Sequence, residues 1–139
     1  MGRILAVDLG TRRVGLAITD PLQLIASPLE KLTFTGEDRL VQDLLALTSA
    51  KAVERVVVGL PIREDGSEGE GCRQARHLAR RLETAGLAVS LWDERYSSRE
   101  AQNALREMGF DRRRSLERID PVAAAIILED FLRSDTPGR

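Results

Sequence analysis

Four acidic residues stand where short apolar runs end or a helical pattern begins. Asp8 closes the first apolar run, Asp93 and Glu94 follow a later one, and Asp120 opens the last helical pattern. If a sheet brings these carboxylates together, they repel one another unless cations neutralise them. Oxygen ligands of this kind suit Mg²⁺ or Mn²⁺. Two such ions roughly 3.5–4 Å apart hydrolyse phosphodiesters in many enzymes, so the pattern favours a metal-dependent nuclease.

Each of these acidic residues also fits a structural role. Asp8, two residues before Gly10, equally suits the start of a turn. Asp120 stands before Pro121, as an N-cap residue does before a proline in the first helical position. Asp93 precedes Glu94, and strand alternation lets only one neighbour face a given side. The pattern alone does not choose between these two.

Basic residues cluster close to the expected site. A run of three arginines, 112–114, could hold a phosphate backbone through charge without reading its sequence. A second basic stripe, between residues 73 and 81, is more typical of a solvated helix face. The residues expected to bind nucleic acid are Arg12, Arg95, Arg112, Arg113, Arg114 and Arg118.

Length and composition indicate a single domain over residues 1–139, with 134–139 as a flexible tail. The chain is 42% hydrophobic and 31% charged, which is a globular composition. Its net charge of −1 does not favour general nucleic-acid binding, so any such binding must come from local clusters. No apolar run approaches the roughly 18 residues of a membrane span, and Asp8 comes too early for a signal peptide. We therefore expect a cytoplasmic protein with no membrane contact.

The hydrophobic periodicity predicts the elements that position these residues. Three early strands, at about 3–8, 14–18 and 25–34, precede an alternation of helices and strands, and Pro28 favours an edge position for the third. Further strands are predicted at 55–59 and 87–92. Helices are predicted at 37–50, about 73–85, about 97–109 and from Asp120 or Pro121 to about 132. This order predicts a mixed sheet with helices on its faces.

Five stretches of the sequence closely resemble the YqgF family, in the same order and with similar spacing. They are Asp8–Arg12 with Gly15, Val57–Pro61, Asp65–Glu68, Asp93–Arg95 with Ser97, Ser98 and Ala101, and Asp120 with Ala123, Ala124, Ile127 and Leu128. That family is described as Holliday junction resolvase-like and as pre-16S rRNA nucleases. Two positions depart from its usual pattern, because Arg63-Glu64 stands where Asn is common and Arg118 where Lys is common.

The resemblance implies a ribonuclease H-like α/β fold, shared with RuvC-type resolvases, with a mixed five-stranded sheet and helices on both faces. It implies that Asp8, Glu94 and Asp120 are the catalytic residues and the metal ligands, which favours Glu94 over Asp93. It also implies hydrolysis of phosphodiesters in trimming the 5′ end of precursor 16S rRNA, and the expected cofactor is a divalent metal, Mg²⁺ or Mn²⁺. The expected partner is precursor rRNA, or structured or single-stranded DNA.

Three other functions fit parts of this pattern. A Holliday junction resolvase-like DNA nuclease would use the same chemistry, but it needs two active sites and hence a dimer. A non-catalytic RNA-binding factor in ribosome assembly could retain the fold. The Asp8–Thr11 stretch also resembles the first phosphate loop of ATP-binding proteins of the actin and heat-shock-chaperone type, although 139 residues provide one lobe of the two needed. The sequence leaves both monomer and homodimer open.

Overall fold

The computed structural model describes residues 2–10, 12–94 and 119–134, and for 119–121 it describes the backbone alone. The helix predicted at about 97–109 and most of the predicted tail lie outside these residues. None of the helices within this part combines the length and the apolar character that a membrane span requires.

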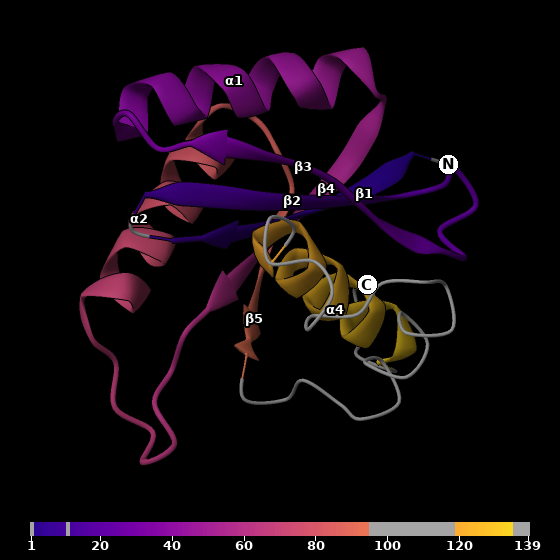
Figure 1. The fold of residues 1–139 in the computed structure, drawn as a ribbon. Coiled ribbons are helices and arrows are strands. Elements are labelled where there is room, and N and C mark those ends of the chain that lie inside the picture. Colours follow the sequence, from indigo (N-terminus) through magenta and orange to yellow (C-terminus); the bar gives the residue numbers. More distant parts are fainter. Residues whose placement is uncertain (1, 11, 95–118, 135–139) are drawn as a thin grey trace.

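Five strands form one mixed sheet (Figure 1), as predicted. They are β1 (Arg3–Leu9), β2 (Arg13–Thr19), β3 (Ala26–Thr33), β4 (Val53–Leu60) and β5 (Val89–Asp93). The order across the sheet is β3-β2-β1-β4-β5. β2 is antiparallel to both of its neighbours, whereas β1, β4 and β5 run parallel to one another. β3, which contains Pro28, lies at an edge of the sheet, as its proline predicted.

Helices cover both faces of the sheet (Figure 1). α1 (Glu37–Ala50) and α2 (Glu70–Thr84) pack on one face, and α4 (Ile119–Arg133) packs on the other. Strand alternation divides the core accordingly, because neighbouring residues of a strand point to opposite faces. In β1, Leu5 and Val7 join the cluster under α1 and α2, whereas Ile4 and Ala6 join the cluster under α4.

The central strands are buried on both faces. Val56, Val57 and Val58 of β4 have no exposed surface, as the run of three valines predicted. β1 lies between β2 and β4 and is equally covered at its centre. The two strands therefore form a rigid support for whatever stands at their ends.

Several element boundaries differ from the prediction, and β4 begins at Val53, two residues earlier than predicted. α2 begins at Glu70 rather than near 73, although Gly71 lowers the helix propensity of its first turn. An ion pair between Glu70 and Arg73, 2.8 Å apart, spans that turn. β5 begins at Val89, two residues later than predicted. The end of α2 agrees with the prediction, since Gly86 follows it with a positive φ of 101°.

Candidate active site

The carboxyl-terminal ends of β1, β4 and β5 lie at one edge of the sheet, because these three strands are parallel. Asp8 is the next-to-last residue of β1, and Glu94 directly follows β5. The register pairs Val7 with Val58 and Leu60 with Asp93, so the two strand ends lie close to the same level. Residues that are 86 positions apart in the chain thus meet at one edge.

Asp8 belongs to the face that α4 covers. Every second residue of a strand points to the same face of the sheet. Ile4 and Ala6 pack under α4, so Asp8 lies on their face, whereas Leu5 and Val7 point toward α1 and α2. The residue is half-buried, and the strand that holds it is central to the sheet. Its carboxylate therefore stands at the rim of α4 on a rigid backbone.

Glu94 lies on the same face, over Gly59 of β4. A methyl group added at Gly59 would lie 3.2 Å from Glu94 Cδ and 3.3 Å from its Cγ. The same methyl group would lie 2.8 Å from Ile127 Cδ1 of α4. Gly59 thus provides the space that the Glu94 side chain and α4 occupy together.

Asp93 points to the other face of the sheet. Trp92 packs with the residues under α4, so alternation turns its neighbour Asp93 toward α2. There Asp93 is close enough to Glu68 for its charge to raise the pKa of that carboxyl group. Of these two neighbours, Glu94 is therefore the one on the face of Asp8.

Asp120, the third predicted ligand, is the second residue of α4. The described structure gives its backbone, which lies in the first helical turn as predicted. Among the residues whose side chains are described, no group of three or more His, Cys, Asp or Glu could hold a metal ion. Asp8 and Glu94 are brought to one face and one edge, while the side chain of Asp120 lies outside this description.

Trp92 connects the end of β5 to α4. Its indole Nε1 donates a hydrogen bond to Oδ2 of Asp130 over 3.1 Å, and its ring meets the ring of Phe131 edge-on at 5.7 Å. Asp130 is 8% exposed, so this bond is largely shielded from water. The contact fixes the strand end from which Glu94 extends.

The loop after β4 has a defined conformation on the α2 side of the same edge. Ser67 donates two hydrogen bonds to Asp65, from its hydroxyl at 2.6 Å and from its backbone N–H at 2.8 Å, and these hold the pKa of Asp65 below its ordinary value. Arg76 of α2 donates two hydrogen bonds to Glu68. They lower the pKa of Glu68, although burial and Asp93 act in the opposite direction. The loop is thereby pinned to α2.

Of the predicted nucleic-acid-binding residues, Arg12 alone lies within the described residues. It stands in the turn between β1 and β2, four residues after Asp8, and is exposed. Its backbone carbonyl accepts a hydrogen bond from Phe34, which ties this turn to the end of β3. The remaining five, Arg95, Arg112, Arg113, Arg114 and Arg118, lie outside the described residues.

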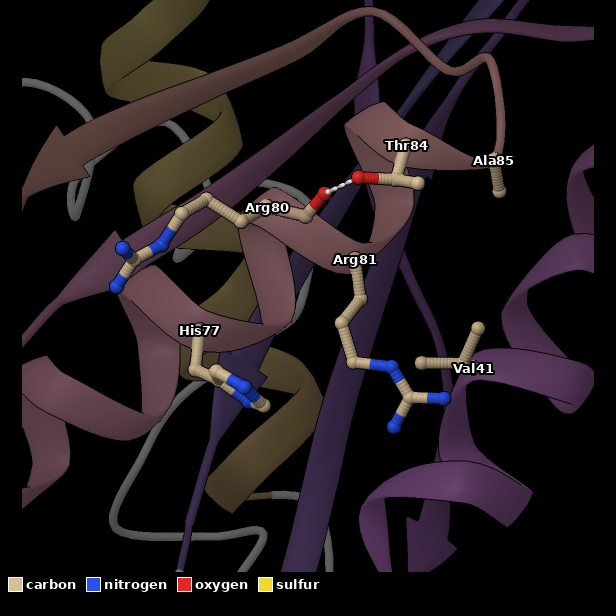
Figure 2. A pocket seen from close by; sticks show the side chains of 6 residues that line it. All are labelled: Val41, His77, Arg80, Arg81, Thr84 and Ala85. Atoms are coloured by element: carbon tan, nitrogen blue, oxygen red, sulfur yellow. Dashed lines mark hydrogen bonds between the residues drawn. The ribbon is translucent and has the colours of Figure 1, made fainter.

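The opposite face of the molecule carries a hollow of about 500 Å³ between α1 and α2. Figure 2 shows the side chains around it, among them His77, Arg80 and Arg81 from α2. Glu37 of α1 lies 2.6 Å from His77 and 3.1 Å from Arg81, so two of these basic groups face a carboxylate. This neutralised surface agrees with the solvated helix face predicted for the stripe, and it is separated from Asp8 by the sheet.

The two described carboxylates fit a hard divalent cation. Both are oxygen donors, they share one face and one edge, and Gly59 leaves the room in which the Glu94 carboxylate lies. No cysteine or histidine is part of this edge, since Cys72 is buried under α2 and His77 lies on the far face. A donor set of carboxylates alone favours Mg²⁺ or Mn²⁺ over Zn²⁺.

The role of Gly59 was missed in the sequence interpretation. The residue was assigned to a buried strand, and its lack of a side chain was not used. A glycine at the end of an otherwise β-branched buried strand often marks a close approach of another group. That signal was present in Val58-Gly59-Leu60 and could have pointed to the site.

Comparison with solved structures identifies the class of fold. The alignment with the structure of RuvC from Thermus thermophilus covers 94% of this chain and 95% of the RuvC chain, with a TM-score of 0.61 and 16% sequence identity. The alignment with the yeast mitochondrial Holliday junction resolvase Ydc2 covers 95% of this chain and 78% of the Ydc2 chain, with a TM-score of 0.58 and 10% identity. The protein therefore has the ribonuclease H-like fold of the RuvC-type resolvases.

The sequence defines the family more narrowly. The chain belongs to the RuvX family, also called YqgF, whose model is described as Holliday junction resolvase and matches residues 2–134. A relative from Anaeromyxobacter dehalogenans is 42% identical over 97% of this chain and 99% of its own length. Another from Koribacter versatilis is 39% identical over 94% of this chain and 86% of its own. Both bear the name "Putative pre-16S rRNA nuclease", which denotes a hydrolase of phosphodiester bonds.

Proposed function

We propose that this protein is a metal-dependent nuclease that processes the 5′ end of precursor 16S rRNA in the cytoplasm. One observation supports it above all others. Asp8 and Glu94, which come from distant parts of the chain, stand on the same face at the same edge of a rigid sheet. The names of the relatives supply the substrate, precursor 16S rRNA, and the fold is one that resolvases share.

In this proposal Asp8, Glu94 and Asp120 hold Mg²⁺ or Mn²⁺. Such ions, when bound, activate a water molecule and stabilise the leaving oxygen of a phosphodiester. The chain supplies the positions: β1 fixes Asp8, and the space over Gly59 together with Ile127 fixes Glu94. The fixed geometry matters because ligands that are already placed need no reorganisation when the substrate arrives. Arg12, Arg95, Arg118 and the arginines 112–114 bind the phosphate backbone.

The first test compares four single substitutions with the unchanged protein. Asp8→Asn, Glu94→Gln and Asp120→Asn each keep the side-chain shape and remove a charged ligand. We expect each to lower kcat by about 100-fold or more, since the loss of an active-site charge typically costs several kcal/mol. Asp93→Asn is the matched control, because it removes a carboxylate one residue from Glu94 but on the other face of the sheet. It should keep activity within about threefold.

The substrates are labelled precursor 16S rRNA, single-stranded DNA and a four-way DNA junction, each in Mg²⁺, Mn²⁺ or EDTA. Cleavage of the RNA near its mature 5′ end, lost in EDTA, is the expected result. If the Asp8→Asn protein cleaves as fast as the unchanged protein, the assignment of the site is wrong. If the protein binds precursor rRNA but cleaves none of the three substrates with either metal, it is an assembly factor rather than a nuclease.

A junction-resolving activity has a separate signature. It requires two active sites and therefore a dimer, whereas trimming of a single strand does not. Preferred cleavage of the four-way junction, together with a dimeric mass by analytical ultracentrifugation, would replace precursor rRNA as the proposed substrate. The metal-ligand assignment would be unaffected, because the phosphodiester chemistry is the same.

A further inference from the structure

Arg13 has no acidic partner among the residues that the structure describes. Five other arginines of these segments pair with carboxylates on their own or a neighbouring element: Arg39, Arg73, Arg76, Arg81 and Arg133. Arg13 is the first residue of β2, is exposed, and makes no side-chain hydrogen bond or ion pair with any described residue. An exposed arginine whose side chain makes no hydrogen bond or ion pair with the described residues is available to a ligand.

The register places Arg13 on the same face as Asp8. Its neighbour Val14 is fully buried in the cluster under α1 and α2, so Arg13 and Gly15 belong to the α4 face. Gly15 is directly opposite Asp8 in the antiparallel pair of β1 and β2. Residues that are opposite in such a pair share a face, so Arg13 lies one step along β2 from the position that faces Asp8.

Lys31 extends this line to the edge of the sheet. It is opposite Gly15 in the pair of β2 and β3, it is exposed, and it therefore shares the face of Asp8. Two strand spacings separate it from Asp8, which amounts to roughly 10 Å between their Cα atoms. Across the α4 face, acidic residues therefore stand at β5 and β1 and basic residues at β2 and β3.

We propose that Arg13 and Lys31 bind the phosphate backbone next to the cleaved phosphodiester, so that the nucleic-acid strand crosses the sheet edge from β5 toward β3. This inference rests on the proposed nuclease function and adds Arg13 and Lys31 to it as residues that position the substrate. Arginine offers a planar fork and lysine a point charge, and both bind phosphate oxygens. The chain has a net charge of −1, so a local basic border beside the carboxylates is what a polyanion requires for binding.

Binding is measured first, with a fluorescein-labelled single-stranded RNA in Mg²⁺ and with Asp8→Asn as the parent protein to prevent cleavage. Arg13→Gln and Lys31→Gln should each weaken binding about three- to fivefold, as loss of an exposed ionic contact does. Each should also reduce the slope of log K against log salt by about 0.7. In the cleaving protein the same changes should raise KM more than they lower kcat, and Arg13→Lys should restore most of the affinity.

Matched controls separate a local contact from the overall charge. Arg80→Gln removes an exposed arginine of α2 on the opposite face, and Lys51→Gln removes the other lysine of the chain. Both should leave affinity and salt dependence unchanged. The proposal is overturned if they weaken binding as much as the test variants do, or if Arg13→Gln and Lys31→Gln bind like their parent.

Failure of the proposed function looks different from failure of this inference. If the unchanged protein cleaves but the two test variants have normal KM and salt dependence, the nuclease function is supported and the binding role of Arg13 and Lys31 is wrong. If no substrate is cleaved but the RNA titration shows the predicted losses, the binding role is supported and the nuclease function is wrong. Thermal unfolding of each variant should match its parent, because both side chains are exposed.

Discussion

At the residue scale, Gly59 determines how closely β4, Glu94 and α4 approach one another. It is buried between Val58 and Leu60 in the middle layer of the fold. Any side chain at this position would compete with Glu94 and with Ile127 for the same space. The position therefore links the packing of α4 to the placement of a proposed metal ligand.

Replacement of Gly59 by alanine should reduce both activity and stability. The new methyl group would lie 2.8 Å from Ile127 Cδ1 and 3.2 Å from Glu94 Cδ, so both side chains must shift. We expect a loss of about tenfold or more in kcat, since small misplacements of catalytic groups are costly. The free energy of unfolding should fall by about 1–2 kcal/mol.

A compensating change isolates the cause of that loss. Ile127→Val removes the Cδ1 atom that the new methyl group would meet, so the double variant should recover stability relative to Gly59→Ala alone. Activity should recover in part, because the contact with Glu94 remains. A Gly59→Ala protein with normal kcat would show that the position of Glu94 is not fixed by this contact. Urea denaturation and cleavage assays measure the two effects separately.

The bond between Trp92 and Asp130 should contribute measurably to stability. Asp130→Leu leaves the indole N–H without its acceptor in a largely dry environment, which costs about 1–3 kcal/mol. Asp130→Asn keeps an oxygen acceptor and should cost less. Trp92 is the sole tryptophan of the chain, so its fluorescence reports unfolding directly. Equal stability of the Leu and Asn variants would argue that packing against Phe131, not the hydrogen bond, holds β5 to α4.

At the scale of elements, the contact between α1 and α2 depends on ionic groups near Glu37. Burial raises the pKa of Glu37, but hydrogen bonds from His77 and Arg81 outweigh this effect and leave the pKa below its ordinary value. A carboxyl group whose pKa is lowered by folding stabilises the fold above its unfolded pKa. That contribution is lost as the pH falls through the lowered value.

The stability difference between the unchanged protein and Glu37→Gln should therefore depend on pH. It should be present at pH 6–7, where Glu37 is charged in both the folded and the unfolded chain. It should shrink as the pH falls below about 4, near the ordinary pKa of glutamate. Glu64→Gln, in the exposed loop after β4, is the control and should show no such change. Urea denaturation at several pH values measures both, and a difference that is constant down to pH 3 would contradict the linkage.

The elements themselves could largely be predicted from the sequence. Their patterns are strong, since Val56–Val58 can only be a buried strand and the leucines of α1 repeat at helical spacing. The start of α2 was predicted too late, because glycines 69 and 71 lower helix propensity while the ion pair from Glu70 to Arg73 and packing of the helix on the sheet favour it. Such tertiary contributions are not visible in local propensity.

At the scale of the whole molecule, the sheet separates two groups of ionic side chains. The α1 and α2 face carries paired charges such as Glu37 with Arg81, which contribute to packing. The α4 face carries Asp8, Glu94, Arg13 and Lys31, which the proposals assign to catalysis and binding. On these proposals, the charges assigned to catalysis and binding all lie on one side of the buried sheet.

The candidate site could be predicted in part. Asp8 and Glu94 were identified because each ends a strand and each matches a family motif. Their common face could not be derived from the pattern, since it depends on which helix covers which side of the sheet. Arg13 and Lys31 escaped notice for the same reason, because they meet Asp8 only through the register of β1, β2 and β3. The role of Asp120 stays a prediction.

The distribution of the proposed ligands along the chain has a consequence for the cell. Asp120 follows Asp8 by 112 residues, so Asp8 leaves the ribosome well before Asp120 and α4 are synthesised. β1 and β5 reach a common edge only after β4 has taken its place between them. A nascent or prematurely terminated polypeptide would therefore lack a complete metal site. By the proposed assignment, the protein would acquire nuclease activity only after α4 has been synthesised and has packed on the sheet.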